Sequence, residues 1–116
     1  MKYMMLNYRD EAASANMTKE EQMQEIQEYN AFWEYARQRA TIISGEAVHP
    51  TSAATTIRVR DGKTLTTDGP FAETREALAG FYIIDCKDLD EAMEIASKIP
   101  VARDGSVEIR PVVTFE

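Results

Sequence analysis

The feature of this chain that most constrains its fold is a pair of strand-like segments with apolar side chains on both faces. Residues 2–8 place Met4 and Leu6 on one alternating face and Tyr3 and Met5 on the other. Residues 81–84 form a continuous apolar run, Phe-Tyr-Ile-Ile. A strand that is apolar on both sides needs cover on both sides. If helices cover one face, we expect Tyr3 and Met5 to lie on the other.

The remaining elements follow from periodicity and from residues typical of helix and strand ends. Thr18-Lys-Glu-Glu21 has capping-box spacing, and a stripe at steps of three or four continues to Ala40. Asp88 or Asp90 caps a second helix that Pro100 ends. The stripe residues of the first helix are Met23, Ile26, Tyr29, Trp33, Ala36 and Ala40. We expect strands at 2–8, 42–45, 55–60, 63–67, 81–86 and 107–115, helices at 18–40 and 88–99, and a short helix at 72–78.

This order predicts the fold class. The strands at 55–60 and 63–67 are joined by Asp61-Gly62, which favours a type I′ hairpin. Without that hairpin the order is β-α-β-β-α-β, which is typical of an α+β, ferredoxin-like sandwich with both helices on one face of an antiparallel sheet. Since a bare apolar sheet face is unfavourable in water, we expect a homodimer that packs face to face.

Length and charge narrow the class of protein. The 116 residues predict a single domain spanning 1–116. A formal net charge of −7 disfavours direct nucleic-acid binding and binding to anionic membranes. Cys86 is the only cysteine, and no His/Cys/Asp pattern has metal-ligand spacing. We therefore expect a cytoplasmic protein with no cofactor and no metal.

Asp68-Gly-Pro-Phe71 is the most distinctive motif, and it brings in a resemblance. The tetrapeptide lies within a longer run, Thr67-Asp-Gly-Pro-Phe-Ala-Glu-Thr-Arg-Glu76. Gly45-Glu46 and Gly105-Ser-Val-Glu-Ile-Arg-Pro111 belong to the same pattern. The chain resembles, nearly end to end, the branch of the YCII-related family named for Asp-Gly-Pro-Phe. The resemblance implies a dimeric α/β-barrel arrangement but no assigned reaction.

Two further implications come from the wider family. Relatives include a dehalogenase or isomerase of chlorinated muconolactones, and members of this branch often accompany extracytoplasmic-function sigma factors. Small members look as if they pair a histidine on the first helix with an aspartate. Residues 18–40 contain no histidine, so that pair is not carried over to this chain.

The candidate site residues lie around the Asp-Gly-Pro-Phe turn. We expect His49, Asp68 and Glu46 as acid/base groups, because His49 is the only side chain with an unperturbed pKa near neutrality. Arg75 would hold an anionic substrate. Glu73 and Phe71 complete the expected binding set. A structural role is the alternative: Asp68 would accept backbone N–H bonds in the turn, and Phe71 would anchor the turn in the core.

Two functions remain open at this point. One is binding of a small polar or anionic molecule in a cleft near the turn, with cofactor-independent isomerase- or lyase-type acid/base activity. The other is a non-catalytic regulatory role, for example as the partner of a sigma factor. A polar cavity beside His49, Asp68 or Glu46 would favour the first.

Overall fold

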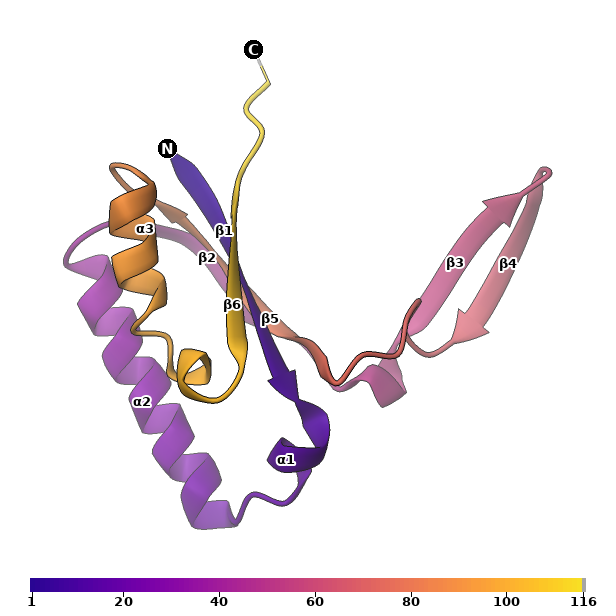
Figure 1. The fold of residues 1–116 in the computed structure, drawn as a ribbon, viewed down its shortest axis with the longest axis horizontal. Coiled ribbons are helices and arrows are strands. Elements are labelled where there is room, and N and C mark those ends of the chain that lie inside the picture. The colour runs from indigo at the N-terminus through magenta and orange to yellow at the C-terminus, as the bar shows by residue number, and fades with distance from the viewer. Residues whose placement is uncertain (116) are drawn as a thin grey trace.

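The computed structural model describes residues 1–115 and has the predicted ferredoxin-like α+β fold. Four antiparallel strands form the main sheet in the order β2 (Thr41–Ala47), β5 (Glu76–Asp85), β1 (Lys2–Asp10) and β6 (Ser106–Pro111). The inserted hairpin pairs β3 (Thr55–Arg60) with β4 (Lys63–Asp68). The helices are α1 (Glu11–Ala15), α2 (Lys19–Arg37) and α3 (Leu89–Ala96), with short 3-10 turns η1 (Thr51–Ala53) and η2 (Pro100–Arg103). The hairpin stands apart from the rest of the molecule (Figure 1).

The core lies between one face of the main sheet and the helices α2 and α3. Met5 and Ile84 from the sheet are fully buried, as are Ile95 of α3 and Ile99 just after it. Tyr3 is 3% exposed and belongs to the same cluster. The expectation that Tyr3 and Met5 face away from the helices is therefore wrong. Apolarity on both sides shows that both faces need cover, but not which face the helices take.

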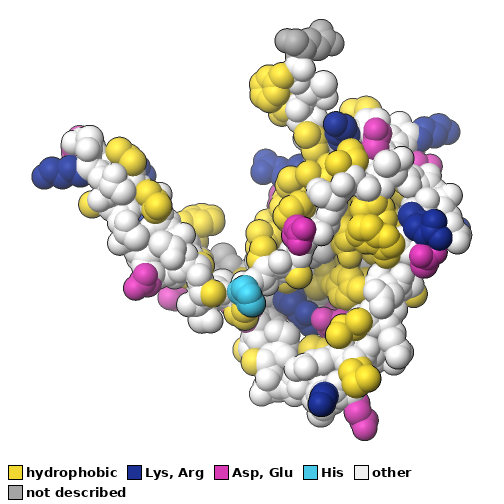
Figure 2. Space-filling view, turned by 180° about the vertical axis from the view of Figure 1, so that it is seen from behind, with side chains coloured by type: hydrophobic (Ala, Val, Ile, Leu, Met, Phe, Trp, Pro, Cys, Tyr) yellow, Lys and Arg dark blue, Asp and Glu magenta, His cyan; other side chains and the backbone are white. Residues whose placement is uncertain are grey.

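The opposite, open face of the sheet carries the alternate side chains of each strand, those that point away from the helices. Met4 pairs with Ile83 and Leu6 with Phe81, so these four side chains form a half-buried apolar patch. Figure 2 views the molecule from behind and shows hydrophobic side chains gathered on the body and along the hairpin.

Both helix starts are confirmed. Thr18 Oγ1 accepts the Glu21 N–H at 3.1 Å and the Glu21 carboxylate accepts the Thr18 N–H at 3.2 Å, which completes the capping box. The Asp88 carboxylate accepts the Glu91 N–H at 2.9 Å, so Asp88 rather than Asp90 is the cap.

The predicted apolar stripe of α2 is only partly buried. Ala36 is fully buried, but Met23 and Ile26 are 56% and 61% exposed. The helix also ends at Arg37, before Ala40. The first turns of α2 therefore stand off from the sheet, and the two cavities described below lie beside this part of the helix and the turns that follow it.

The short helix predicted at 72–78 is wrong, because β5 begins at Glu76. Pairing with two neighbours outweighs the local helical pattern: Ala77 lies opposite Arg9, and Gly80 lies between Asn7 and Ala47. A Cβ on Gly80 would come within 2.7 Å of the Glu46 carbonyl oxygen, so the close strand approach requires glycine there.

The structural role expected for the Asp-Gly-Pro-Phe turn is also wrong in two respects. Phe71 is 78% exposed and does not anchor the turn in the core. Among residues 1–115, no hydrogen bond involves the Asp68 carboxylate. The turn is held instead by the Gly69 N–H, which donates to the Ala54 carbonyl at 2.7 Å, and by the Thr56 hydroxyl, which donates to the Gly69 carbonyl at 2.8 Å.

Two smaller findings complete the fold. The last strand, expected at 107–115, spans Ser106–Pro111. None of the helices in the described part of the chain is long and apolar enough to cross a membrane.

Candidate functional site

The six residues expected to form the site lie along the connections between the body and the hairpin. His49 is exposed between β2 and η1, where the cyan side chain of Figure 2 marks the base of the hairpin. The others are Glu46 near the end of β2, Asp68 at the end of β4, and Phe71, Glu73 and Arg75 in the segment that leads to β5, all exposed. Within residues 1–115, no hydrogen bond or ion pair joins any two of them.

Arg75 has a partner of a different kind. Its Nε lies 3.7 Å from Asp10 Oδ2, and its side chain is 90% exposed. An ion pair so exposed contributes little to stability. The expected residues are thus spread along the connections to the hairpin, and the three cavities described for this chain do not include the turn in their walls.

A cavity of about 410 Å³ lies between the middle of α2 and the β2 edge of the sheet. Of the expected site residues, Glu46 borders it. Its sheet wall includes Asn7 of β1 and Tyr82 of β5, and its helix wall includes Tyr29 and Trp33. Its size fits a small organic molecule, since ligand pockets range from about 300 to 1,000 Å³.

Asn7 is the unusual residue in this cavity. It is 5% exposed and lies on the helix side of β1, at the position that follows Tyr3 and Met5 in the same alternation. Its Oδ1 is buried without a hydrogen-bond partner, and no hydrogen bond involving its side-chain amide is found in the described residues. A buried amide oxygen without a partner costs about 1–3 kcal/mol. Such a cost in a cavity wall is typical of a group that a ligand or an ordered water satisfies.

Aromatic rings, among them those of Trp33 and Tyr82, form a further part of the cavity wall. The Tyr82 ring lies 5.1 Å from Phe32 and 6.3 Å from Trp33, centroid to centroid, both at 52°. Gly45 makes this arrangement possible, because a Cβ there would lie 2.6 Å from Tyr82 Cδ1. The Gly45-Glu46 motif therefore has a concrete role: its glycine lets the Tyr82 ring lie across β2.

The ion pair between Arg9 and Glu25 forms another part of the cavity wall. Arg9 Nη1 and Nη2 donate to the two Glu25 carboxylate oxygens at 2.8 and 2.9 Å, with side chains 27% and 28% exposed. Hydrogen bonding to Glu25 raises the pKa of Arg9 above its ordinary value. The bidentate geometry fixes both side chains in one position.

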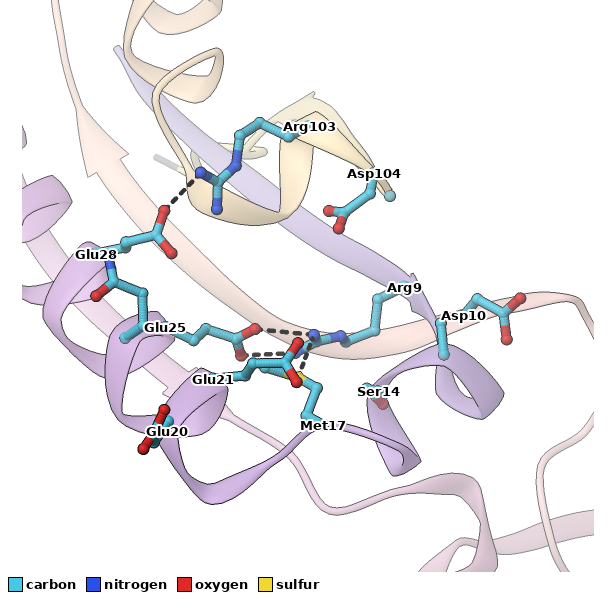
Figure 3. A pocket seen from close by; sticks show the side chains of 13 residues that line it. Arg9, Asp10, Ser14, Met17, Glu20, Glu21, Glu25, Glu28, Arg103 and Asp104 are labelled. Atoms are coloured by element: carbon cyan, nitrogen blue, oxygen red, sulfur yellow. Dashed lines mark hydrogen bonds and ion pairs between the residues drawn. The ribbon is translucent and has the colours of Figure 1, made fainter.

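The same pair is also a wall of a second cleft. This cleft of about 590 Å³ lies among α1, the start of α2 and η2, and Figure 3 shows its side chains. Arg103 Nη1 lies 2.6 Å from Glu28 Oε2 across one side of it. The remaining acidic residues are Asp10, Glu20, Glu21 and Asp104. Within residues 1–115, no three His, Cys, Asp or Glu side chains are grouped so that they could hold a metal ion.

Burial of Tyr82 leads to a prediction about alkaline pH. Desolvation, with a smaller contribution from Tyr29, raises the pKa of Tyr82 to about 12. A raised pKa favours the protonated phenol in the folded state, so its stabilising effect is complete below pH 10 and is lost as the pH rises toward 12. Because the ring is partly exposed and solvent screens the shift, we expect Tyr82 to account for a fall of about 1–2 kcal/mol in the free energy of unfolding over that range. Tyr82→Phe, followed by urea unfolding at each pH, should remove most of this fall; an unchanged slope would contradict it.

One feature of the sequence could have pointed to this cavity, but the motifs near the turn are more conspicuous. Asn7 interrupts an otherwise apolar strand on the face that proves to be buried. Arg9 and Glu25 lie 16 positions apart and on different elements, and no spacing rule connects them.

Fold and site together define a class: a small ferredoxin-like α+β domain with a cavity between its first long helix and the edge of its sheet. Comparisons with known proteins assign the chain to a family. A model of the YCII-related domain matches residues 1–116, and the chain belongs to that family. It is 38% identical over 123 aligned positions to an uncharacterized protein of Rhizobium meliloti, covering 100% of this chain and 95% of the relative. The resemblance drawn from the sequence motifs is confirmed.

Proposed function

We propose that this protein binds a small, partly apolar organic molecule in the cavity between α2 and the sheet. The observation that carries the proposal is the buried, unpaired amide oxygen of Asn7, a residue of the cavity wall. A ligand group that both donates and accepts, such as a carboxamide, a carboxylic acid or a hydroxy-lactone, would satisfy both ends of that amide. The proposal keeps the small-molecule function expected from the sequence and moves its location away from the turn.

The walls narrow the ligand chemistry. The rings of Tyr82 and Trp33 offer an apolar surface, and the charge of Arg9 is already matched by Glu25. A near-neutral polar group on a flat or compact apolar body fits these walls better than a multiply charged anion, which would need an unmatched cation.

The acid/base activity expected from the sequence has a different candidate group in this cavity. Glu25 is a carboxylate in its wall, and while it is paired with Arg9 its oxygens keep further lone pairs that can accept a proton from a ligand. Burial raises the pKa values of Tyr29 and Tyr82, so their phenols are hydrogen-bond donors at neutral pH. Isomerase- or lyase-type proton transfer therefore belongs to the proposal, with Glu25 as base.

The test is a thermal-shift screen of small carboxamides, hydroxy acids and lactones, run on the wild type and two variants. Asn7→Leu removes the amide at similar volume, and Arg75→Met removes the cation near the turn. We expect compounds that stabilise the wild type and Arg75→Met but bind Asn7→Leu about tenfold more weakly or worse, because two hydrogen bonds are lost.

Asn7→Leu should fold at least as stably as the wild type, because an unpaired buried amide is replaced by an apolar group. Its melting temperature is the control for intact structure. Binding that survives in Asn7→Leu and is lost in Arg75→Met would place the ligand at the turn instead. A screen with no stabilising compound would reject the small-molecule function.

The homodimer expected from the sequence belongs to the same proposal. The supporting observation is the open sheet face, where Met4, Leu6, Phe81 and Ile83 are half-buried without a covering layer in one chain. Sedimentation equilibrium should give twice the 13.1 kDa chain mass, and a monomer at every concentration would contradict it. The regulatory alternative, a sigma-factor partner, remains a prediction that no contact in the structure favours over a second copy.

A further inference from the structure

The hairpin formed by β3 and β4 extends away from the body that makes it. The molecule measures 48 × 47 × 18 Å, with a radius of gyration of 16.2 Å. A compact chain of this length has about 13 Å. Figure 1 shows the reason, because the hairpin projects to one side and joins the body at its base. A two-stranded hairpin by itself is marginally stable in water, so an arm of this kind needs a surface to lie on.

The two faces of the hairpin differ in chemistry. Ile57 lies opposite Thr66 and Val59 opposite Thr64, so the middle and tip of one face carry no charge, and Asp68 opposite Thr55 lies at its base. Ile57 is 65% exposed and Val59 is 59% exposed. The other face carries the basic side chains Arg58, Arg60 and Lys63 together with Leu65. Two exposed β-branched apolar residues on one face are typical of a strand that another surface covers in the functional assembly.

The area of the sheet face also leaves room for the arm in a dimer. The four strands contain 32 residues, so at about 3.3 Å per residue and about 4.8 Å between strands the sheet covers roughly 500 Å² per subunit. Two such faces cover about 1,000 Å², which is less than the roughly 1,200 Å² of a stable protein interface. A pair of arms, one from each copy, supplies the missing area.

Charge favours a second copy of this chain as the surface that receives the arm. The whole chain has a formal net charge of −7, whereas residues 55–68 contain three basic and two acidic side chains. An arm with a small positive charge is attracted to a body that carries the excess of acid. In a closed two-fold dimer each arm meets the partner's body in the same way, so one sequence provides both sides of the contact.

We propose that the β3–β4 hairpin is an intersubunit arm, which lays its Ile57/Val59 face on the second copy of the chain. This inference rests on the dimer proposed above and adds a second contact to the one between the sheet faces. The arm would also be ordered by the partner, since its apolar face is covered only in the assembly.

The experiment compares dimer dissociation constants, measured by sedimentation equilibrium, for the wild type and three full-length variants. Ile57→Asp/Val59→Asp places two charges on the apolar face of the arm, and Leu65→Asp places one charge on its other face as a control. Leu6→Asp disrupts the open sheet face. We expect the double variant to weaken the dimer about a hundredfold or more, and Leu65→Asp to change it less than about threefold.

The outcomes separate the arm from the dimer. A wild type that stays monomeric overturns both. A dimer that Leu6→Asp weakens and the double variant does not overturns the arm alone. Equal weakening by the double variant and Leu65→Asp overturns the assignment of the apolar face. Hydrogen exchange gives a second readout: the amides of β3 and β4 should be protected in concentrated wild type and lose protection on dilution, and protection that does not depend on concentration would contradict an intersubunit contact.

Discussion

Replacing Ile84 by alanine is expected to lower the free energy of unfolding by about 3–4 kcal/mol. Ile84 is fully buried beside Tyr3 in the middle of the sheet, beneath both helices. Removing three carbons there leaves a cavity that neighbouring elements cannot fill, because β5 is held by β1 on one side and β2 on the other. Urea unfolding at one fixed protein concentration measures the loss.

Ile83→Ala is the matched control, since it makes the same change one residue earlier on the open face. Ile83 is half-buried in the isolated chain, so we expect a loss of about 1 kcal/mol or less in the folding of one chain. Its effect should appear instead as weaker self-association. Equal losses for Ile83→Ala and Ile84→Ala at a concentration where the chain is monomeric would mean that the two faces are assigned the wrong way round.

Gly105→Ala is expected to cost about 2–3 kcal/mol of unfolding free energy, and the cause is steric. Gly105 begins the turn into β6, where its N–H donates to the Val101 carbonyl at 2.7 Å. A Cβ at this position would overlap the Tyr8 carbonyl oxygen and come within 2.9 Å of Val101 Cγ2. Since the first of these atoms belongs to the backbone of β1, the strands themselves must shift. Denaturant unfolding is again the measurement.

Gly62→Ala tests a different glycine requirement in the same chain. Gly62 has φ of +74° at the tip of the hairpin, and a Cβ added there would meet no atom within 4 Å. Only the conformational cost of about 1 kcal/mol applies there, and it falls on an arm outside the core. A loss for Gly62→Ala as large as that for Gly105→Ala would contradict the steric explanation.

The candidate site shows where sequence reasoning stops. Sequence patterns led us to ionisable residues near the most recognisable motif, His49, Asp68 and Arg75, and the structure leaves these exposed. The cavity is formed instead by residues with no motif. Asn7 matters because the alternation of side chains along β1 places it on the buried face. Arg9 matters because Glu25 of α2 forms an ion pair with it. Neither fact is local in sequence.

The hairpin shows the reverse case. Asp61-Gly62 predicted its turn, and the backbone confirms it with φ of 53° and 74° at these residues. Its place in space was not predictable, because nothing within residues 55–68 says whether the hairpin packs on its own body or leaves it. The same holds for Phe71, whose exposure depends on where the hairpin begins to diverge.

The sequence by itself determined the β-α-β-β-α-β order of the main elements, the Thr18 capping box and the hairpin turn. These depend on interactions within a few residues or on a period of two, which a single chain displays directly. Tertiary structure alone decided three things: which face of β1 meets the helices, that 76–80 joins the sheet rather than a helix, and that Asn7, Glu25 and Tyr82 share one cavity. Each is set by contacts between distant segments, where the free energy of strand pairing and burial outweighs local preference.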